Sequence, residues 1–282
     1  MQIRSGPIFN AFKYAVFALL AIDIAFYYEL NSAAEGFTFK DGVSFADFVV
    51  AYADAIDSFA WVGLLLMFEI ETSIDPPEHL HKQVTAAIGA LTLLCWAGII
   101  YAFYGYVGGL DLIRGFSAWS GPDPCSLAGE GSSYAVSLDE YVPLDAANCR
   151  ELGARPFHNA ELSMFASADA LSMIKRLTWT DIVNAGTWIL LAALIEFEIM
   201  MRAIRRATPK LLRRIHLAQA PLWAILVIAV FYWLALGEPF EAYDASLWIA
   251  CFFFIELNMM AKHEARARRR AEREAGSKGS PA

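Results

Sequence analysis

Three glutamates, each placed directly after a run of apolar residues, are the side chains of this sequence best suited to chemistry inside a membrane. Each belongs to one spacing: Asp or Asn, three residues, Trp, seven apolar residues, Glu, one apolar residue, then Glu or Asn. A fixed spacing found three times predicts an internal repeat. The copies carry Asp57, Trp61, Glu69 and Glu71; Asn184, Trp188, Glu196 and Glu198; and Asp244, Trp248, Glu256 and Asn258.

Helix geometry gives the depth of the first glutamate in each copy. It comes 12 residues after the Asp or Asn, which is roughly 18 Å along a helix in a hydrocarbon layer roughly 30 Å thick. A carboxylate at that depth is costly when it faces lipid. Glu69, Glu196 and Glu256 are therefore predicted to point into the bundle, where adjacent carboxylates share a proton or hold a cation. The alternative is structural, with each glutamate hydrogen-bonding a neighbouring helix.

Other polar residues of the apolar segments are secondary candidates. Glu71, Glu198 and Asn258 lie about 200° around the helix from the first glutamates, which favours contact with a neighbouring helix or with headgroups. Asp23, inside the first apolar run, either joins the same pathway or bonds a tyrosine hydroxyl. The three tryptophans are predicted to anchor the helices at the membrane surface or to pack between them.

Composition indicates a membrane protein. Of 282 residues, 57% are hydrophobic and 18% charged, and the mean hydropathy is +0.42. No basic face with interleaved aromatics suggests nucleic acid, and no nucleophile triad, HExxH, CxxC or phosphate-loop pattern suggests an enzyme. His79 and His81 are interpreted as a solvated loop. No cofactor is predicted, and metal binding stays open.

The apolar runs predict an all-α membrane protein whose six transmembrane helices form three hairpin repeats. The expected spans are 11–30, 56–74, 84–107, 180–201, 217–236 and 244–261. An acidic, aromatic segment at 31–55 is predicted to lie on the membrane surface. Asp75-Pro76-Pro77 ends the second span, because proline cannot continue a helix, and Gly108-Gly109 is interpreted as the exit of the third.

A polar insertion separates the third and fourth predicted helices. The chain is thus divided into helices 1–3 with the surface segment (1–107), an insertion (108–177), helices 4–6 (178–262) and a basic tail (263–282). Cys125 and Cys149 lie in the insertion. A disulfide between them is predicted, because secreted loops favour such bonds; two free thiols are the alternative.

Lysine and arginine predict the orientation in the membrane. They are concentrated in the connector 202–214 and in the tail, and are sparse in the insertion. Both termini are therefore predicted to be cytoplasmic and the insertion periplasmic, in a bacterial inner membrane.

The pattern favours a small channel or transporter for a proton or small cation, with membrane lipids around it. The alternative is a non-catalytic subunit or assembly factor of a larger membrane complex, either as a homo-oligomer or with partner subunits. An intramembrane enzyme that uses His79 or His81 with Glu69 or Glu71 and a metal ranks last.

Overall fold

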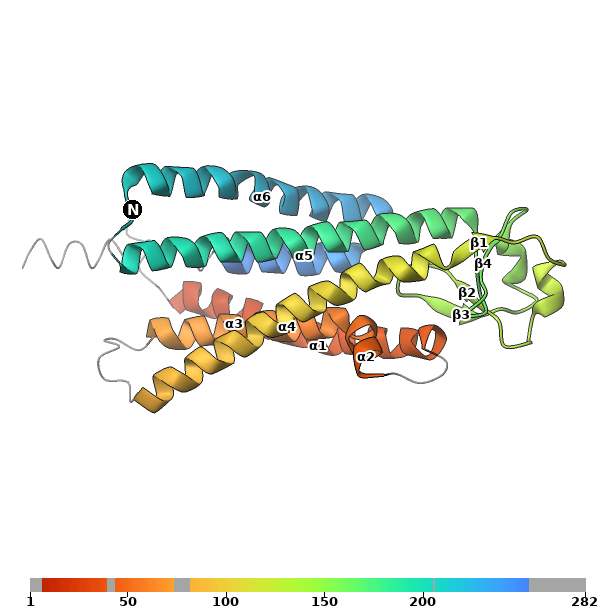
Figure 1. Cartoon of the computed structure of the whole chain (residues 1–282), viewed down its shortest axis with the longest axis horizontal. Coiled ribbons are helices and arrows are strands. Elements are labelled where there is room, and N and C mark those ends of the chain that lie inside the picture. The colour runs from red at the N-terminus through yellow and green to blue at the C-terminus, as the bar shows by residue number, and fades with distance from the viewer. Residues whose placement is uncertain (1–6, 40–43, 74–81, 205, 254–282) are drawn as a thin grey trace, which may run out of the picture.

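The computed structural model describes residues 7–39, 44–73, 82–204 and 206–253. The protein is mostly helical, and its long helices run side by side along the longest axis of the molecule (Figure 1). A small β-sheet caps one end of this bundle, beyond α4 and α5.

The helices are α1 (Pro7–Thr38), α2 (Phe45–Ala51), α3 (Ala53–Ser73), α4 (Lys82–Arg114), α5 (Ala168–Ala203) and α6 (Pro209–Leu236). A further helix runs from residue 239 to the end of the described residues. Four helices in the described part, α1, α4, α5 and α6, are long and apolar enough to cross a membrane. That number supports a membrane protein, whereas six spans and the hairpin repeat stay predictions.

The helix ends differ from the sequence-based expectation at two places, and close helix packing explains the second. The surface segment predicted at 31–55 is split, since α1 continues to Thr38 and α2 is a separate helix that begins with a capping box at Ser44. Helix α4 continues past Gly108-Gly109 to Arg114, so these glycines do not end the helix, and the exit of the third span at this point stays a prediction. A Cβ added at Gly105 would lie 2.7 Å from the Val49 carbonyl oxygen. The glycines of α4 let α2 approach its backbone instead of ending the helix.

The segment between α4 and α5 contains a five-stranded sheet that the sequence analysis did not predict. Its strands are β1 (Phe116–Ala118), β2 (Ser133–Ala135), β3 (Tyr141–Pro143), β4 (Phe157–Asn159) and β5 (Met164–Ala166), in the order β1-β4-β5-β2-β3. All pairs are antiparallel except β2 with β5. The helices on either side are longer than expected, so this unit is smaller than the predicted insertion of 108–177.

Two short 3-10 helices in the same segment bring its cysteines together. Cys125 lies in η2 (Pro124–Leu127) and Cys149 in η3 (Cys149–Leu152). Their Sγ atoms are 2.01 Å apart, which is the distance of a disulfide bond.

Tryptophans form the centre of the helical core. The ring of Trp61 on α3 lies 6.4 Å from that of Trp188 on α5 and 6.3 Å from that of Trp248, in edge-to-face contacts. The three are at most 7% exposed. They therefore pack between helices, which was one of the two roles predicted for them.

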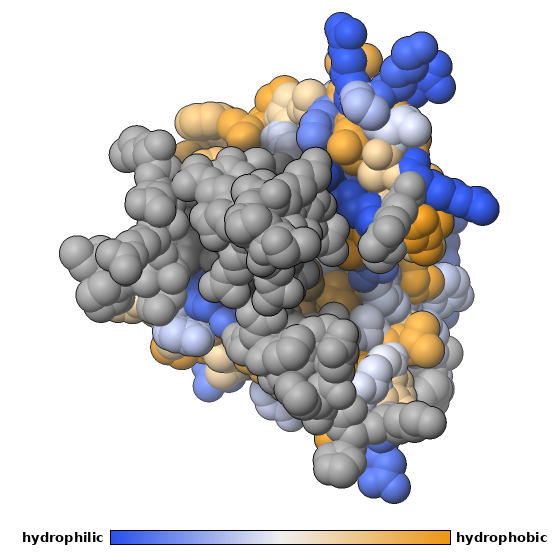
Figure 2. Space-filling model, turned by 90° about the vertical axis from the view of Figure 1, so that its left-hand side faces the viewer, coloured by the Kyte–Doolittle hydropathy of each residue, from blue (hydrophilic) through white to orange (hydrophobic). Residues whose placement is uncertain are grey.

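Charge differs between the two ends of the bundle. At the end opposite the sheet, hydrophilic side chains project from the periphery (Figure 2). The exposed basic residues of α5, α6 and their connector belong to this end: Arg202, Arg206, Lys210, Arg213 and Arg214. The sheet end holds the acids described next.

Candidate functional site

A small cavity lies inside the bundle towards the sheet end. Its volume is about 50 Å³, and we call it the aromatic cavity. It is lined by the Asp or Asn and the Trp of every predicted repeat: Asp57, Asn184, Asp244, Trp61, Trp188 and Trp248. The remaining polar or aromatic lining residues are Tyr27, Asp54, Ser58, Tyr106, Asp181, Trp233 and Glu241.

A larger cavity lies between the helices and the sheet, and we call it the acidic vestibule. Its volume is about 480 Å³. Its acidic lining residues are Asp47, Asp54, Asp111, Asp139, Glu161, Asp181, Glu238 and Glu241. Among the described residues, no Lys, Arg or His lines either cavity. The two cavities adjoin, because Asp54, Tyr106, Asp181, Trp233 and Glu241 line both.

Three acids at the junction of the cavities extend the repeated spacing. Asp54, Asp181 and Glu241 each lie three residues before the repeated Asp or Asn. Three residues on a helix rise by roughly 4.5 Å and return to nearly the same face. Each helix thus presents an acid at the junction, then Asp or Asn, then Trp four residues further on.

Neutral donors hold several of these carboxylates. Tyr27 of α1 donates its hydroxyl to Glu241 at 3.0 Å, and Tyr106 of α4 donates to Asp57 at 3.4 Å. Asn31 of α1 donates to Asp54 at 3.0 Å. Among the described residues, Asp111 is the one acid of these two cavities that forms an ion pair, with the exposed Arg114 of its own helix. The deeper carboxylates are therefore oriented without being neutralised by a cationic side chain there.

Buried polar atoms without a hydrogen-bond partner gather at the aromatic cavity. They include Oδ1 of Asn184, Oδ1 of Asp244 and Nε1 of Trp233, a residue only 2% exposed. The Trp233 indole faces Asp181, but its Nε1 lacks a partner at hydrogen-bond distance and angle. Asp23, 3% exposed, has an unpartnered Oδ2 and lies beside Asp244. Such atoms are costly when dry, so the cavity is built for a polar occupant.

The sheet contributes an acid whose proton affinity is altered. Asp139 lies in the hairpin between β2 and β3 and faces the vestibule. Burial, together with the negative charges of Asp54 and Glu238, raises the pKa of Asp139 to about 8. Burial and the charge of Glu140 also raise the pKa of Glu238. Asp139 and Glu238 therefore hold a proton more readily than free carboxylates do.

The first glutamates of the repeats have separate partners where the structure describes them. Glu69 accepts from Lys13 Nζ at 2.6 Å, and Lys13 is 7% exposed. Glu196 is exposed and accepts from Trp96 Nε1 at 2.9 Å. Glu256 lies outside the described residues, so convergence of all three glutamates stays a prediction.

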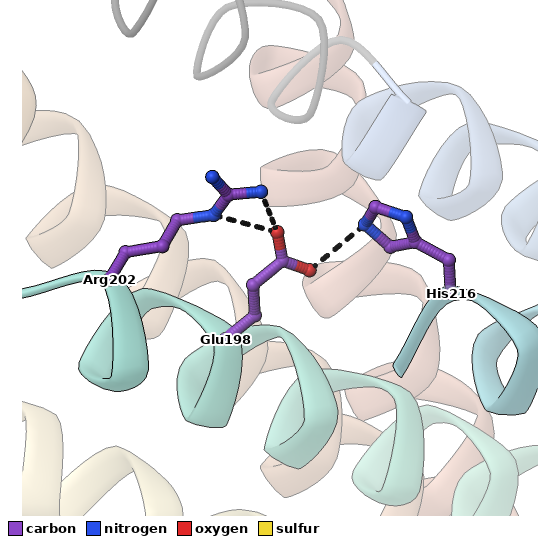
Figure 3. A network of polar contacts seen from close by, with 3 residues as sticks. All are labelled: Glu198, Arg202 and His216. Carbon is purple, nitrogen blue, oxygen red and sulfur yellow. Dashed lines mark hydrogen bonds and ion pairs between the residues drawn. The ribbon is translucent and has the colours of Figure 1, made fainter. Parts of the chain in front are cut away.

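One secondary glutamate joins two helices at the end opposite the sheet. Glu198 of α5 accepts from Arg202 at 2.9 and 2.6 Å and lies 3.2 Å from His216 of α6 (Figure 3). The side chain of Glu71 and all of Asn258 lie outside what the structure describes, as do His79 and His81.

Comparison of the chain with protein-family models, with curated proteins and with solved structures finds no match. Function is therefore inferred from the two cavities alone. The described residues contain no group of three or more His, Cys, Asp or Glu placed to hold a metal ion.

Sequence reasoning missed the acids at the junction. Asp54, Asp181 and Glu241 stand near predicted helix starts, where an acid is ordinary because it favours the helix dipole. Their common offset of three residues before the repeated Asp or Asn was the available signal.

Proposed function

We propose that this protein carries a small cation or a proton across the membrane, and that the cation enters through the acidic vestibule. One observation carries the proposal. Asp54, Asp181 and Glu241 line both cavities, and they come from separate helical segments without a cationic partner in the described residues.

Electrostatics explains why this arrangement favours a cation. Five carboxylates line the aromatic cavity of about 50 Å³: Asp54, Asp57, Asp181, Glu241 and Asp244. Like charges so close, with little water between them, oppose their joint ionisation. Bound protons or a cation relieve that repulsion, while the tyrosine and asparagine donors keep the oxygens in place.

The tryptophan layer supports a gated carrier rather than an open pore. The ring of Trp61 packs against those of both Trp188 and Trp248, and all three rings line the cavity. Glu69, eight residues beyond Trp61 in the sequence, is roughly 12 Å further along the helix. Transport thus requires these rings to separate, and the repeated glutamates Glu69, Glu196 and Glu256 then become candidates for the other half of the path.

The distribution of charge supports the orientation predicted from the sequence. The exposed arginines and lysine at the connector of α5 and α6 favour the cytoplasmic side. The vestibule and the sheet then face the periplasm, where Cys125 and Cys149 would meet an oxidising environment.

Flux from proteoliposomes tests the proposal. The purified protein is expected to dissipate an imposed gradient of protons, alkali cations or amines in an assay with an internal pH dye. The triple variant Asp54→Asn, Asp181→Asn, Glu241→Gln should lose at least about tenfold of the flux, as one charge-assisted contact is already worth about that factor. Glu130→Gln, at an exposed turn of the sheet unit, is the matched control.

Two results would overturn this function. One is a wild-type protein that moves none of these cations, which would favour the alternative of a non-catalytic subunit or assembly factor. The other is a triple variant that inserts normally and transports as fast as the wild type. A second triple variant, Glu69→Gln, Glu196→Gln, Glu256→Gln, tests whether the repeated glutamates belong to the same path.

A further inference from the structure

We propose that the ligand of this site is a protonated linear amine of the polyamine class, with one ammonium group in the aromatic cavity and its chain in the acidic vestibule. This inference rests on the proposed function and specifies the kind of cation.

The lining of the aromatic cavity suits an ammonium group. Six aromatic side chains line it together with the five carboxylates: Tyr27, Trp61, Tyr106, Trp188, Trp233 and Trp248. Indole and phenol faces attract alkylammonium groups through the quadrupole of the ring. Calcium instead prefers roughly six to eight oxygen ligands at short distances, and the described residues contain no group of three or more His, Cys, Asp or Glu placed to hold a metal ion.

The number of hydrogen-bond acceptors at the cavity also fits an ammonium group. An alkylammonium has three N–H donors and no acceptor. The level above the tryptophans offers one acceptor side chain from each helical segment, namely Asp57, Asn184 and Asp244. Oδ1 of Asn184 and Oδ1 of Asp244 are buried and without a partner. A bound –NH3⁺ would give both of them a donor.

The sizes of the two cavities favour an elongated molecule. The aromatic cavity, at about 50 Å³, has room for a head group, because a site needs only roughly 10–15 Å³ to hold one water. The vestibule, at about 480 Å³, falls in the range of roughly 300–1,000 Å³ that is typical of small-molecule sites. Its acids, among them Asp139 and Glu238, lie where further ammonium groups of a polycation would reach.

Binding of defined amines to the purified full-length protein tests the inference. The intrinsic tryptophan fluorescence and the melting temperature are followed while putrescine or spermidine is added. Butylamine tests whether a second ammonium group is needed, and tetramethylammonium tests whether N–H donors are needed. The uncharged 1,4-butanediol tests whether charge is needed. Mg²⁺ and K⁺ test whether inorganic cations bind as well. We expect the diamine to bind at least about tenfold more tightly than butylamine or tetramethylammonium, since each charge-assisted hydrogen bond contributes about a factor of ten.

Variants separate this site from general attraction of polycations to an acidic surface. Asn184→Leu keeps the charge of the protein and removes one acceptor, so the affinity for putrescine should fall about tenfold. Asp244→Asn should also weaken binding, whereas Glu130→Gln should leave it unchanged. Equal binding by wild type and Asn184→Leu, or stronger binding of Mg²⁺ than of spermidine, would overturn the proposed ligand class.

The outcomes also distinguish the two proposals. If the protein transports protons or alkali cations but does not bind amines, the proposed ligand class is wrong and cation transport is retained. Amine binding without flux of any cation, including the amine, keeps the site and removes transport.

Discussion

Asp139 gives a sharp test of the electrostatics of the vestibule. Because the folded protein raises its pKa from 3.8 to about 8, the folded state holds a proton that the unfolded chain releases. Stability from this group is fully present below about pH 4 and is lost progressively as the pH rises to about 8. Replacing Asp139 with Asn removes this loss, so the variant should gain stability over the wild type as the pH increases.

The magnitude follows from the size of the shift. A change from 3.8 to about 8, at about 1.4 kcal/mol per pKa unit, sets an upper bound of about 6 kcal/mol. The side chain is only half-buried, and solvent screening reduces the effect to about 2 kcal/mol. In a chain of this size that corresponds to roughly 5 °C in melting temperature.

The assay is thermal unfolding of the detergent-purified protein, followed by tryptophan fluorescence at pH 5, 6.5 and 8.5. The difference between Asp139→Asn and wild type should grow across this series, whereas Glu130→Gln should show no such trend. A difference that is the same at all three pH values, or a variant less stable than wild type at pH 8.5, would refute the electrostatic reasoning.

Three further predictions concern packing and cross-links. Glu69→Gln should destabilise the protein by about 3 kcal/mol, because it removes the anionic partner of the buried Lys13; adding Lys13→Met should recover part of that loss in the same melting assay. Gly105→Ala should lower the stability by about 1–3 kcal/mol through overpacking against α2, whereas Gly36→Ala, where an added Cβ meets nothing within 4 Å, should be neutral or stabilising; equal effects would contradict the packing account. Cys125→Ser should lower the stability by about 3 kcal/mol if the pair is bonded, and the wild type should then change mobility on a gel after reduction.

The sequence analysis chose its site candidates among the glutamates of the repeated spacing. The same spacing contains Asp57, Asn184 and Asp244, which the structure places around one cavity, although they were not named as site residues. The glutamates were chosen because each follows a run of apolar residues, and a carboxylate within such a run is costly to expose to lipid. Partners such as Lys13 and Trp96 come from other helices, and no local pattern in the sequence indicates them.

The sheet and the helix lengths could not be read from the chain. Each strand has three residues, which is too short for alternation to be recognised. Helix α5 has 36 residues and is roughly 54 Å long, well beyond a hydrocarbon layer of roughly 30 Å. The turns before residue 180 are the ones that the sequence analysis assigned to the polar insertion, whereas Asp181 lies inside the predicted span.

Asn184 breaks the chemical symmetry of the level that it shares with Asp57 and Asp244. With one neutral amide among three side chains, that level carries at most two negative charges. In the binding mode proposed above, one ammonium group at this level covers one of those charges and leaves the other for a proton. An aspartate at position 184 would add a third charge, so the neutral amide lowers the number of protons that must accompany the proposed ligand.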